Sequence, residues 1–480
     1  MARRSSPGTS GPSGTRSPAR AGAAGRASVG SWAGGLYVSL EEAKKAAARA
    51  VDGLAPVIKA ASREIHDNPE LGLVEFKASA LLTGLLEGCG YTVRRGVAGL
   101  DTAFVATSPW PPRGGSVEPA DGAAGLCPAR PGPFPTVALL AEYDALPGVG
   151  HGCGHNFIGA ASVGAAMALA GVAADSDPFP GSLRVVGCPA EEGAVDGAGG
   201  KVALVEAGVF DDVDAALMVH PGSADSLSGR STCRVALEVS FRGKAAHAAG
   251  APHEGINALE AVLQTLNAIN ALRQHLPGTV LVHGIVARGG DAPNVVPDDG
   301  IIRLYVRAPD PDGIEPAAEK VKNCARGAAM ATGCQVSFRE FARSYLNLVP
   351  NRPLDEVFAR NMAALGRPPA RSASDGRGTG STDMGNVSHV VPAIHPYVAI
   401  TRQLGAPPSH SREFAAASVS PEGEEALIVA AKALAMTCLD LLLSPETLQA
   451  VRDAGPNSGD TDDSGGPRRG RPVSGGGGPI

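Results

Sequence analysis

The stretch TVALLAEYDALPGVGHGCGHNFIGAASVGAAMALA, residues 136–170, sets the fold expected of this chain. It opens with a strand-like apolar run, Thr136–Leu140, and closes with a small-residue run, Phe157–Ala170, that is expected to form a helix. Between the two runs, glycines surround Cys153 and His155, so the backbone can turn and aim both side chains at one point. Cysteine and histidine are common metal ligands. The stretch therefore predicts a strand, a metal-binding turn and a helix in succession.

The same order of strand, polar cluster and helix recurs further along the chain. A strand predicted over Ser182–Cys188 leads to Glu191 and Glu192, and a strand predicted over Asp214–Val219 leads to His220. Repeats of this kind indicate a mostly parallel sheet that carries functional side chains at the carboxyl ends of its strands. The expected class is α/β.

From about Ser231 the pattern changes to strands and helices in the order βαββαβ, which is the ferredoxin-like signature of a compact α+β domain. From about Tyr345 the α/β pattern resumes and ends with a long helix over Gly423–Leu443. The first domain is thus expected to be interrupted by the second. The expected segments are an N-terminal tail (1–36), the α/β domain (37–230 and 344–446), the inserted domain (231–343) and a C-terminal tail (455–480).

Composition limits the class of protein. The 480 residues suffice for two domains plus tails, and a hydrophobic content of 44% suffices for their cores. A net charge of −6, with both signs interspersed, offers no basic surface to nucleic acid. No uninterrupted apolar run approaches the roughly 18 residues of a membrane span, so no membrane partner is expected. Eight cysteines spread thinly over the chain favour reduced thiols over a disulfide framework.

The N-terminal segment has two interpretations. Residues 1–34 contain five arginines, many serines and neither aspartate nor glutamate, a composition typical of an organelle transit peptide. Their proline and glycine content instead favours a disordered tail. The expected location is cytoplasmic, and the alternative is a mitochondrion or plastid if the segment is a transit peptide.

Four clusters of ligand-type residues together predict a metal site. Their members are Cys153, His155, Glu191, Glu192, His220 and His410. Each cluster alone has a plainer explanation, such as a buried cysteine, a solvated strand end, a core histidine or a loop histidine. Adjacent carboxylates repel, however, and a core strand that ends in two of them needs a cation or donors nearby. Jointly they favour two ions about 3.5–4 Å apart, with one glutamate as ligand and the other as general base.

These residues and their surroundings resemble metallopeptidase family M-twenty, the aminoacylase and carboxypeptidase group of di-metal amidohydrolases. The resemblance extends from about Leu40 to Leu443 and is nearest to the dipeptidase subgroup of the β-alanyl-lysine type, with aminobenzoyl-glutamate hydrolases also similar. The motifs that carry it are Asn68-Pro69-Glu70-Leu71-Gly72, Glu142-Tyr143-Asp144-Ala145-Leu146-Pro147 and Ser381-Thr382-Asp383-Met384-Gly385-Asn386-Val387. It implies a di-metal exopeptidase-like catalytic domain, interrupted by an inserted lid and dimerisation domain.

The resemblance also implies roles for single residues. The implied metal ligands are Cys153, His155, Glu192, His220 and His410. Glu191 matches the general base, and His247 matches a lid histidine that stabilises the oxyanion, in several members from the partner subunit. Asn294 and Arg307 resemble groups that hold the carboxylate of the substrate, a task that suits the planar guanidinium of arginine. Considered by themselves, Asn294 and Arg307 could equally be ordinary polar residues of the protein surface, and His247 could be a surface loop residue, so that its role rests on the resemblance.

Two departures from the family pattern bear on substrate and metal. Cys153 stands where the wider family bridges its metals with aspartate, which fits the amidohydrolase branch and leaves zinc and manganese both open. Asn156 stands where many auxin-conjugate-type amidohydrolases have aspartate, which favours the dipeptidase or aminobenzoyl-glutamate side.

The function expected from the resemblance is hydrolysis of the amide of small dipeptides with a basic C-terminal residue, such as β-alanyl-lysine. The alternative is an aminobenzoyl-glutamate or N-acyl-amino-acid amidohydrolase. An inactive metal-binding or scaffold protein is a third possibility, which the presence of all the expected ligands disfavours. A homodimer is expected because an inserted ferredoxin-like sheet offers a free edge for pairing.

Overall fold

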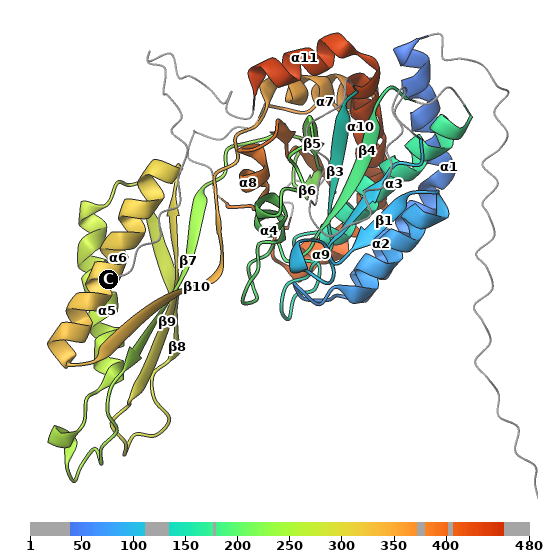
Figure 1. Ribbon diagram of the computed structural model, residues 1–480. Coiled ribbons are helices and arrows are strands. Elements are labelled where there is room, and N and C mark those ends of the chain that lie inside the picture. The colour runs from blue at the N-terminus through green and yellow to red at the C-terminus, as the bar shows by residue number, and fades with distance from the viewer. Residues whose placement is uncertain (1–38, 111–133, 176–178, 372–379, 402–406, 456–480) are drawn as a thin grey trace, which may run out of the picture.

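The computed structural model describes residues 39–110, 134–175, 179–371, 380–401 and 407–455. It has two parts, a large one around a central sheet and a smaller one around a second, outer sheet (Figure 1). The tail predicted over residues 1–36, and all but the first residue of the tail predicted over 455–480, lie outside the described residues.

The central sheet has six strands in the order β1-β2-β4-β3-β5-β11. Their bounds are β1 Thr92–Arg95, β2 Phe104–Thr107, β3 Thr136–Glu142, β4 Ser182–Cys188, β5 Ala215–Leu217 and β11 Ala393–Ile394. Strand β3 runs parallel to β4 and β5, and β11 runs parallel to β5, whereas β1 and β2 form an antiparallel edge. The mostly parallel α/β sheet predicted from the sequence is confirmed.

Strand β3 lies in the middle of this sheet and is buried along its whole length. Because side chains alternate along a strand, Val137 and Leu139 pack into one core while Ala138 and Leu140 pack into another. Helices α1 (Leu40–Asp67), α2 (Phe76–Gly88), α3 (His155–Ala174) and α10 (Pro421–Leu443) supply the first core, and α4 (Gly200–Glu206) and α8 (Met384–Ser388) the second. The result is a three-layer arrangement with helices on both faces.

Helices α3 and α10 are long and apolar enough to cross a membrane by length and composition. Their most apolar windows are 89% and 83% buried within the fold, where they cover the central sheet. Alanine and glycine give α3 its small cross-section, which lets it pack between α1 and the sheet. Both segments are therefore interpreted as core helices.

The outer sheet is antiparallel, with four strands in the order β10-β7-β9-β8. Its elements are β7 Cys233–Arg242, α5 Ala258–Leu272, β8 Leu281–Arg288, β9 Asp299–Ala308, α6 Pro311–Thr332 and β10 Gln335–Tyr345, which is the predicted βαββαβ order. Both helices pack on one face, against residues such as Ile302 and Leu304. Strand β8 is an edge strand, and its Leu281, Ile285 and Val286 are exposed.

Two elements differ from the expectation near the predicted site. Helix α3 begins at His155, two residues before the predicted start, so that its first residue is a predicted ligand. The strand predicted over Asp214–Val219 ends as β5 at Leu217, and His220 begins a separate strand, β6 (His220–Gly222). Strand β6 pairs with β12 (Tyr397–Ala399) in a two-stranded sheet of its own. The break redirects the chain just before His220.

The remaining helices flank these layers: α7 (Arg352–Ala364) and α11 (Pro445–Ala454) pack beside α10, and α9 (Arg412–Ser418) follows His410.

Candidate metal centre and active site

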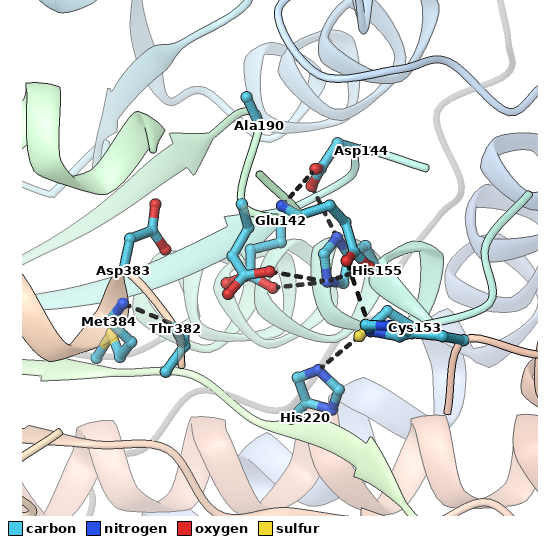
Figure 2. Close-up of polar contacts among 12 residues, drawn as sticks. Glu142, Asp144, Cys153, His155, Ala190, His220, Thr382, Asp383 and Met384 are labelled. Carbon is cyan, nitrogen blue, oxygen red and sulfur yellow. Dashed lines mark hydrogen bonds and ion pairs between the residues drawn. The ribbon is translucent and has the colours of Figure 1, made fainter. Parts of the chain in front are cut away.

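The glycine-rich turn after β3 places Cys153 and His155 beside each other at the end of the central sheet (Figure 2). Gly154, between them, has a φ of +78°, and a Cβ there would lie 2.5 Å from Cγ of Pro221. Only glycine meets both conditions without strain. The turn therefore delivers both side chains into the interior, where His155 is fully buried.

One ring nitrogen of His155 is held and the other faces carboxylates. Nδ1 lies 2.7 Å from Oδ1 of Asp144, while Nε2 lies 3.9 Å from Oε2 of Glu191 and 3.8 Å from Oε1 of Glu192. Burial alone would lower the pKa of His155, but the neighbouring carboxylates of Asp144 and Glu142 outweigh burial and raise that pKa well above its ordinary value. A carboxylate on Nδ1 is the usual device that presents Nε2 to a metal.

The other predicted ligands converge on the same place from distant parts of the chain. Sγ of Cys153 lies 3.5 Å from Nε2 of His220, and Nε2 of His410 lies 3.5 Å from Oε2 of Glu192. His220 directs its Nδ1 to the carbonyl of Pro221 at 2.7 Å, and burial and His395 lower its pKa to about 3. A neutral imidazole whose Nδ1–H is bonded in this way leaves Nε2 free to bind a metal.

The sulfur, nitrogen and oxygen atoms that meet here are of the kinds that bind metal ions. Oε1 of Glu192 is buried and has no hydrogen-bond partner within the described residues, and Nε2 of His155 has no hydrogen bond there, only ion-pair contacts with carboxylates, the nearest of which is Glu142 at 3.3 Å. Buried polar atoms need a partner. The ligand atoms of Cys153, His155 and His220 lie within 4.8 Å of one another, as do those of Cys153, Glu192 and His410. Because Cys153 belongs to both groups, the donors present would suit two cations, with Cys153 among the residues that would hold them.

Glu191 lies beside the ligands on a strained piece of backbone. The residue before it, Ala190, has a φ of +55°, a conformation that alanine rarely adopts. Burial, together with the charges of Glu142 and Asp383, raises the pKa of Glu191 well above its ordinary value in the metal-free protein. A carboxyl with a raised pKa beside a metal cluster is suited to exchange protons with a reacting group.

Behind Glu191 lies a buried ion-pair cluster that the sequence reasoning did not include among site residues. Nζ of Lys201 lies 2.5 Å from Oε1 of Glu142 and also contacts Asp383, and all three side chains are at most 1% exposed (Figure 2 shows the two carboxylates). The other oxygen of Glu142 lies 3.3 Å from Nε2 of His155. Glu142 and Asp383 occur in the motifs of the resemblance, which was a usable signal, whereas a single lysine at the start of a short helix carries none.

The residues predicted to bind substrate, Asn294 and Arg307, and the predicted oxyanion residue His247 lie at two opposite ends of the outer sheet. Arg307 is at the end next to the central sheet, where its guanidinium donates to Oγ of Ser381 at 2.6 Å. Asn294 and His247 lie beyond the other end, where the amide of Ala248 donates to the carbonyl of Asn294 at 3.0 Å. Arg307 lies eight positions after Asp299 along β9, which corresponds to about 26 Å of strand. Within one chain His247 and Asn294 are therefore remote from the predicted metal ligands.

Comparison with known proteins extends these observations. Residues 138–438 match the family described as Peptidase family M20/M25/M40. The chain is 38% identical to the Xaa-Arg dipeptidase of Mus musculus over 420 residues, which cover 86% of this chain and 92% of the relative. It is 37% identical to the Xaa-Arg dipeptidase of Homo sapiens with the same coverage. It is also 34% identical to one of the p-aminobenzoyl-glutamate hydrolase chains of Escherichia coli, over 64% of this chain and 62% of that one.

Solved structures share the fold. The aminobenzoyl-glutamate utilization protein from Klebsiella pneumoniae aligns with a TM-score of 0.63 at 22% identity, over 82% of this chain and 98% of that one. A dinuclear metal-binding peptidase of the M20 family from Bacillus subtilis aligns with a TM-score of 0.55 at 21% identity, over 82% and 99% of the two chains.

Proposed function

This chain belongs to peptidase family M20/M25/M40 and is a metal-dependent hydrolase of peptide or amide bonds, and on that basis we propose that it is a dipeptidase for small dipeptides with a basic C-terminal residue. The observation that carries the chemistry is the buried cluster of sulfur, nitrogen and oxygen donors around Cys153, with Glu191 beside it. Identity of 37–38% to Xaa-Arg dipeptidases over most of both chains supports the substrate class.

We propose that the site holds two divalent ions, zinc or manganese. The ligands would be Cys153, His155, Glu192, His220 and His410. When bound, such ions supply the positive charge that acidifies water and polarises the carbonyl of the substrate. Asp144 keeps His155 in the tautomer that presents Nε2, and the carbonyl of Pro221 does the same for His220.

Glu191 has the proton-transfer role in this proposal. Its carboxylate takes a proton from the attacking water and later gives a proton to the leaving amine. Within the described residues Arg307 forms no ion pair with a carboxylate, and its guanidinium donates only to Nε2 of His283 at 3.1 Å and to Oγ of Ser381 at 2.6 Å. Its guanidinium is therefore suited to bind the carboxylate of the substrate through paired N–H donors.

His247 and Asn294 can serve such a site only from a second copy of the chain. The exposed apolar edge formed by Leu281, Ile285 and Val286 on β8 suits strand pairing between two outer sheets. We therefore propose a homodimer in which the outer sheet is the dimerisation domain and His247 completes the partner's site. Light scattering that found only monomer would remove this support. The proposed location is the cytoplasm, with an organelle as the alternative.

The alternative substrate class is an aminobenzoyl-glutamate or N-acyl-amino-acid conjugate, which the similarity to the Escherichia coli hydrolase favours. A panel of β-alanyl-lysine, aminobenzoyl-glutamate and N-acetyl-amino acids, assayed with zinc- and manganese-loaded protein, separates the two. We expect the highest kcat/KM for the basic dipeptide. A preference for aminobenzoyl-glutamate would establish the alternative, and hydrolysis of no amide by fully loaded protein would refute both.

The variant Glu191→Gln tests the mechanism. The amide keeps the size of the side chain but cannot accept the proton, so turnover should fall by a factor on the order of 10² to 10⁴ while the metal content stays the same. Near-normal turnover of this variant would contradict the assignment of Glu191 as the base.

A further inference from the structure

The segment that carries Glu191 and Glu192 is bound directly to the outer sheet. The amide of Gly197 donates to the carbonyl of Phe341 at 2.7 Å, and the amide of Arg343 donates to the carbonyl of Ala198 at 2.9 Å. Asp196 also forms an ion pair with Arg339 at 2.9 Å. Strand β10 of the outer sheet thus runs alongside the segment from Ala190 to Gly199 and is hydrogen-bonded to it.

Two tyrosines of the outer sheet donate hydrogen bonds to the backbone on either side of Glu192. The hydroxyl of Tyr345 donates to the carbonyl of Glu191 at 2.5 Å, and the hydroxyl of Tyr305 donates to the carbonyl of Gly193 at 3.0 Å. Tyr345 is 2% exposed, so its hydrogen bond is shielded from water. These two bonds hold the peptide groups that set the direction of the Glu191 and Glu192 side chains.

A buried arginine fixes the position of these rings. The guanidinium carbon of Arg234 lies 3.6 Å from the centre of the Tyr345 ring and 4.9 Å from that of Tyr305. Arg234 is only 3% exposed and has no carboxylate partner among the described residues, so stacking on the rings is its main described interaction besides a hydrogen bond to the carbonyl of Arg343. It also lies against Gly193, where a Cβ would be 2.3 Å from its Nη1.

The large domain holds the opposite end of the same segment. The carboxyl of Glu75, fully buried beneath it, accepts a hydrogen bond from the amide of Ala190 at 2.8 Å and another from Oγ1 of Thr102 at 2.7 Å. Glu191 therefore follows a strained residue that is anchored below, and its own carbonyl is anchored by the outer sheet. A shift of the outer sheet against the large domain would therefore change the position of the Glu191 backbone.

We propose that Tyr345, supported by Arg234 and Tyr305, is a positioning residue that places Glu191 for proton transfer and couples its placement to that of the outer sheet. This inference rests on the proposed role of Glu191 as the base. Because a displacement of about 1 Å at a reacting group can lower a rate on the order of a hundredfold, loss of one anchoring bond is expected to reduce kcat while substrate binding through Arg307 persists.

The variant Tyr345→Phe removes the hydroxyl and keeps the ring in place. The matched control is Tyr91→Phe, because Tyr91 is also buried and its hydroxyl also donates to a backbone carbonyl, that of Ala166 at 2.9 Å, in the core of the large domain. In metal-loaded full-length protein, we expect Tyr345→Phe to lower kcat about tenfold with unchanged KM and metal content, and Tyr91→Phe to leave all three unchanged. The variant Arg234→Met should also lower kcat.

A double variant separates this inference from the proposed function. If Glu191 is the base and Tyr345 acts through it, adding Tyr345→Phe to Glu191→Gln should lower the residual rate no further. If Glu191→Gln is inactive but Tyr345→Phe turns over like Tyr91→Phe, the positioning role is overturned and the base assignment stands. If Glu191→Gln remains active, the base assignment fails first, and this inference fails with it.

Discussion

Replacing Lys201 by methionine should destabilise this protein more than any surface charge change. Nζ of Lys201 is fully buried between Glu142, 2.5 Å away, and Asp383. Methionine keeps most of the volume but leaves both carboxylates buried without their cation. Breaking a buried ion pair by removing one partner costs about 3–5 kcal/mol, because the remaining charge stays in the interior. We expect a loss of that size in the free energy of unfolding at neutral pH.

Urea unfolding of the metal-free protein is the appropriate assay, because bound metal would add its own contribution to stability. The matched control is Lys432→Met, which removes a surface ion pair with Asp52 at 2.7 Å and should cost less than about 1 kcal/mol. A double variant, Lys201→Met with Glu142→Gln, should recover part of the loss, because it removes one of the unpaired charges. A loss for Lys201→Met no larger than for Lys432→Met would contradict this account of the buried pair.

The same ion pair predicts a dependence on pH. Burial alone would raise the pKa of Glu142, but Lys201 and His155 outweigh burial and lower it from 4.5 to about 2. A carboxyl whose pKa is lower in the folded state stabilises the protein above its unfolded pKa, and this stabilisation is lost as pH falls toward the folded pKa. The stabilisation that Glu142 contributes to the wild type, followed by urea unfolding, should therefore be full above about pH 4.5 and be lost between pH 4.5 and pH 2.

Two further predictions concern metal binding. The variant Asp144→Asn should weaken metal binding about 10- to 100-fold in a chelator competition. The reason is that Asp144 orients His155 through a contact of 2.7 Å and also accepts a hydrogen bond from the amide of Glu192 at 3.0 Å. Unchanged metal affinity would contradict the orienting role. In the metal-free protein the carboxylates of Asp144 and Glu142 raise the pKa of His155 despite its burial, so metal must displace a proton. Calorimetry in buffers of different ionisation enthalpy should therefore show proton release and tighter binding at pH 8 than at pH 6, and binding without proton release would exclude a protonated His155.

The side chains that meet at the candidate metal centre could be predicted from the sequence, because all of them except His410 follow the end of a predicted strand. In an α/β sheet the carboxyl ends of parallel strands share one edge, so Cys153 and His155 after β3 and Glu192 after β4 had to be neighbours. The spacing of glycines and the chemistry of sulfur, imidazole and carboxylate are local properties, readable without coordinates. The βαββαβ order of the outer sheet was readable for the same reason, from local periodicity.

The distant groups that surround that centre could be identified only in three dimensions. Lys201, at the start of α4, contacts Glu142 and Asp383 because strand order and helix packing bring three separate segments to one buried point. No local sequence pattern predicts this contact. The tyrosine hydroxyls that hold Glu191 likewise come from another domain. The register of the outer sheet also places Arg307 beside the site and keeps His247 and Asn294 at the far end. Pairing between strands fixes where each residue lies along a sheet, and the spacing of residues in the sequence does not reveal that position.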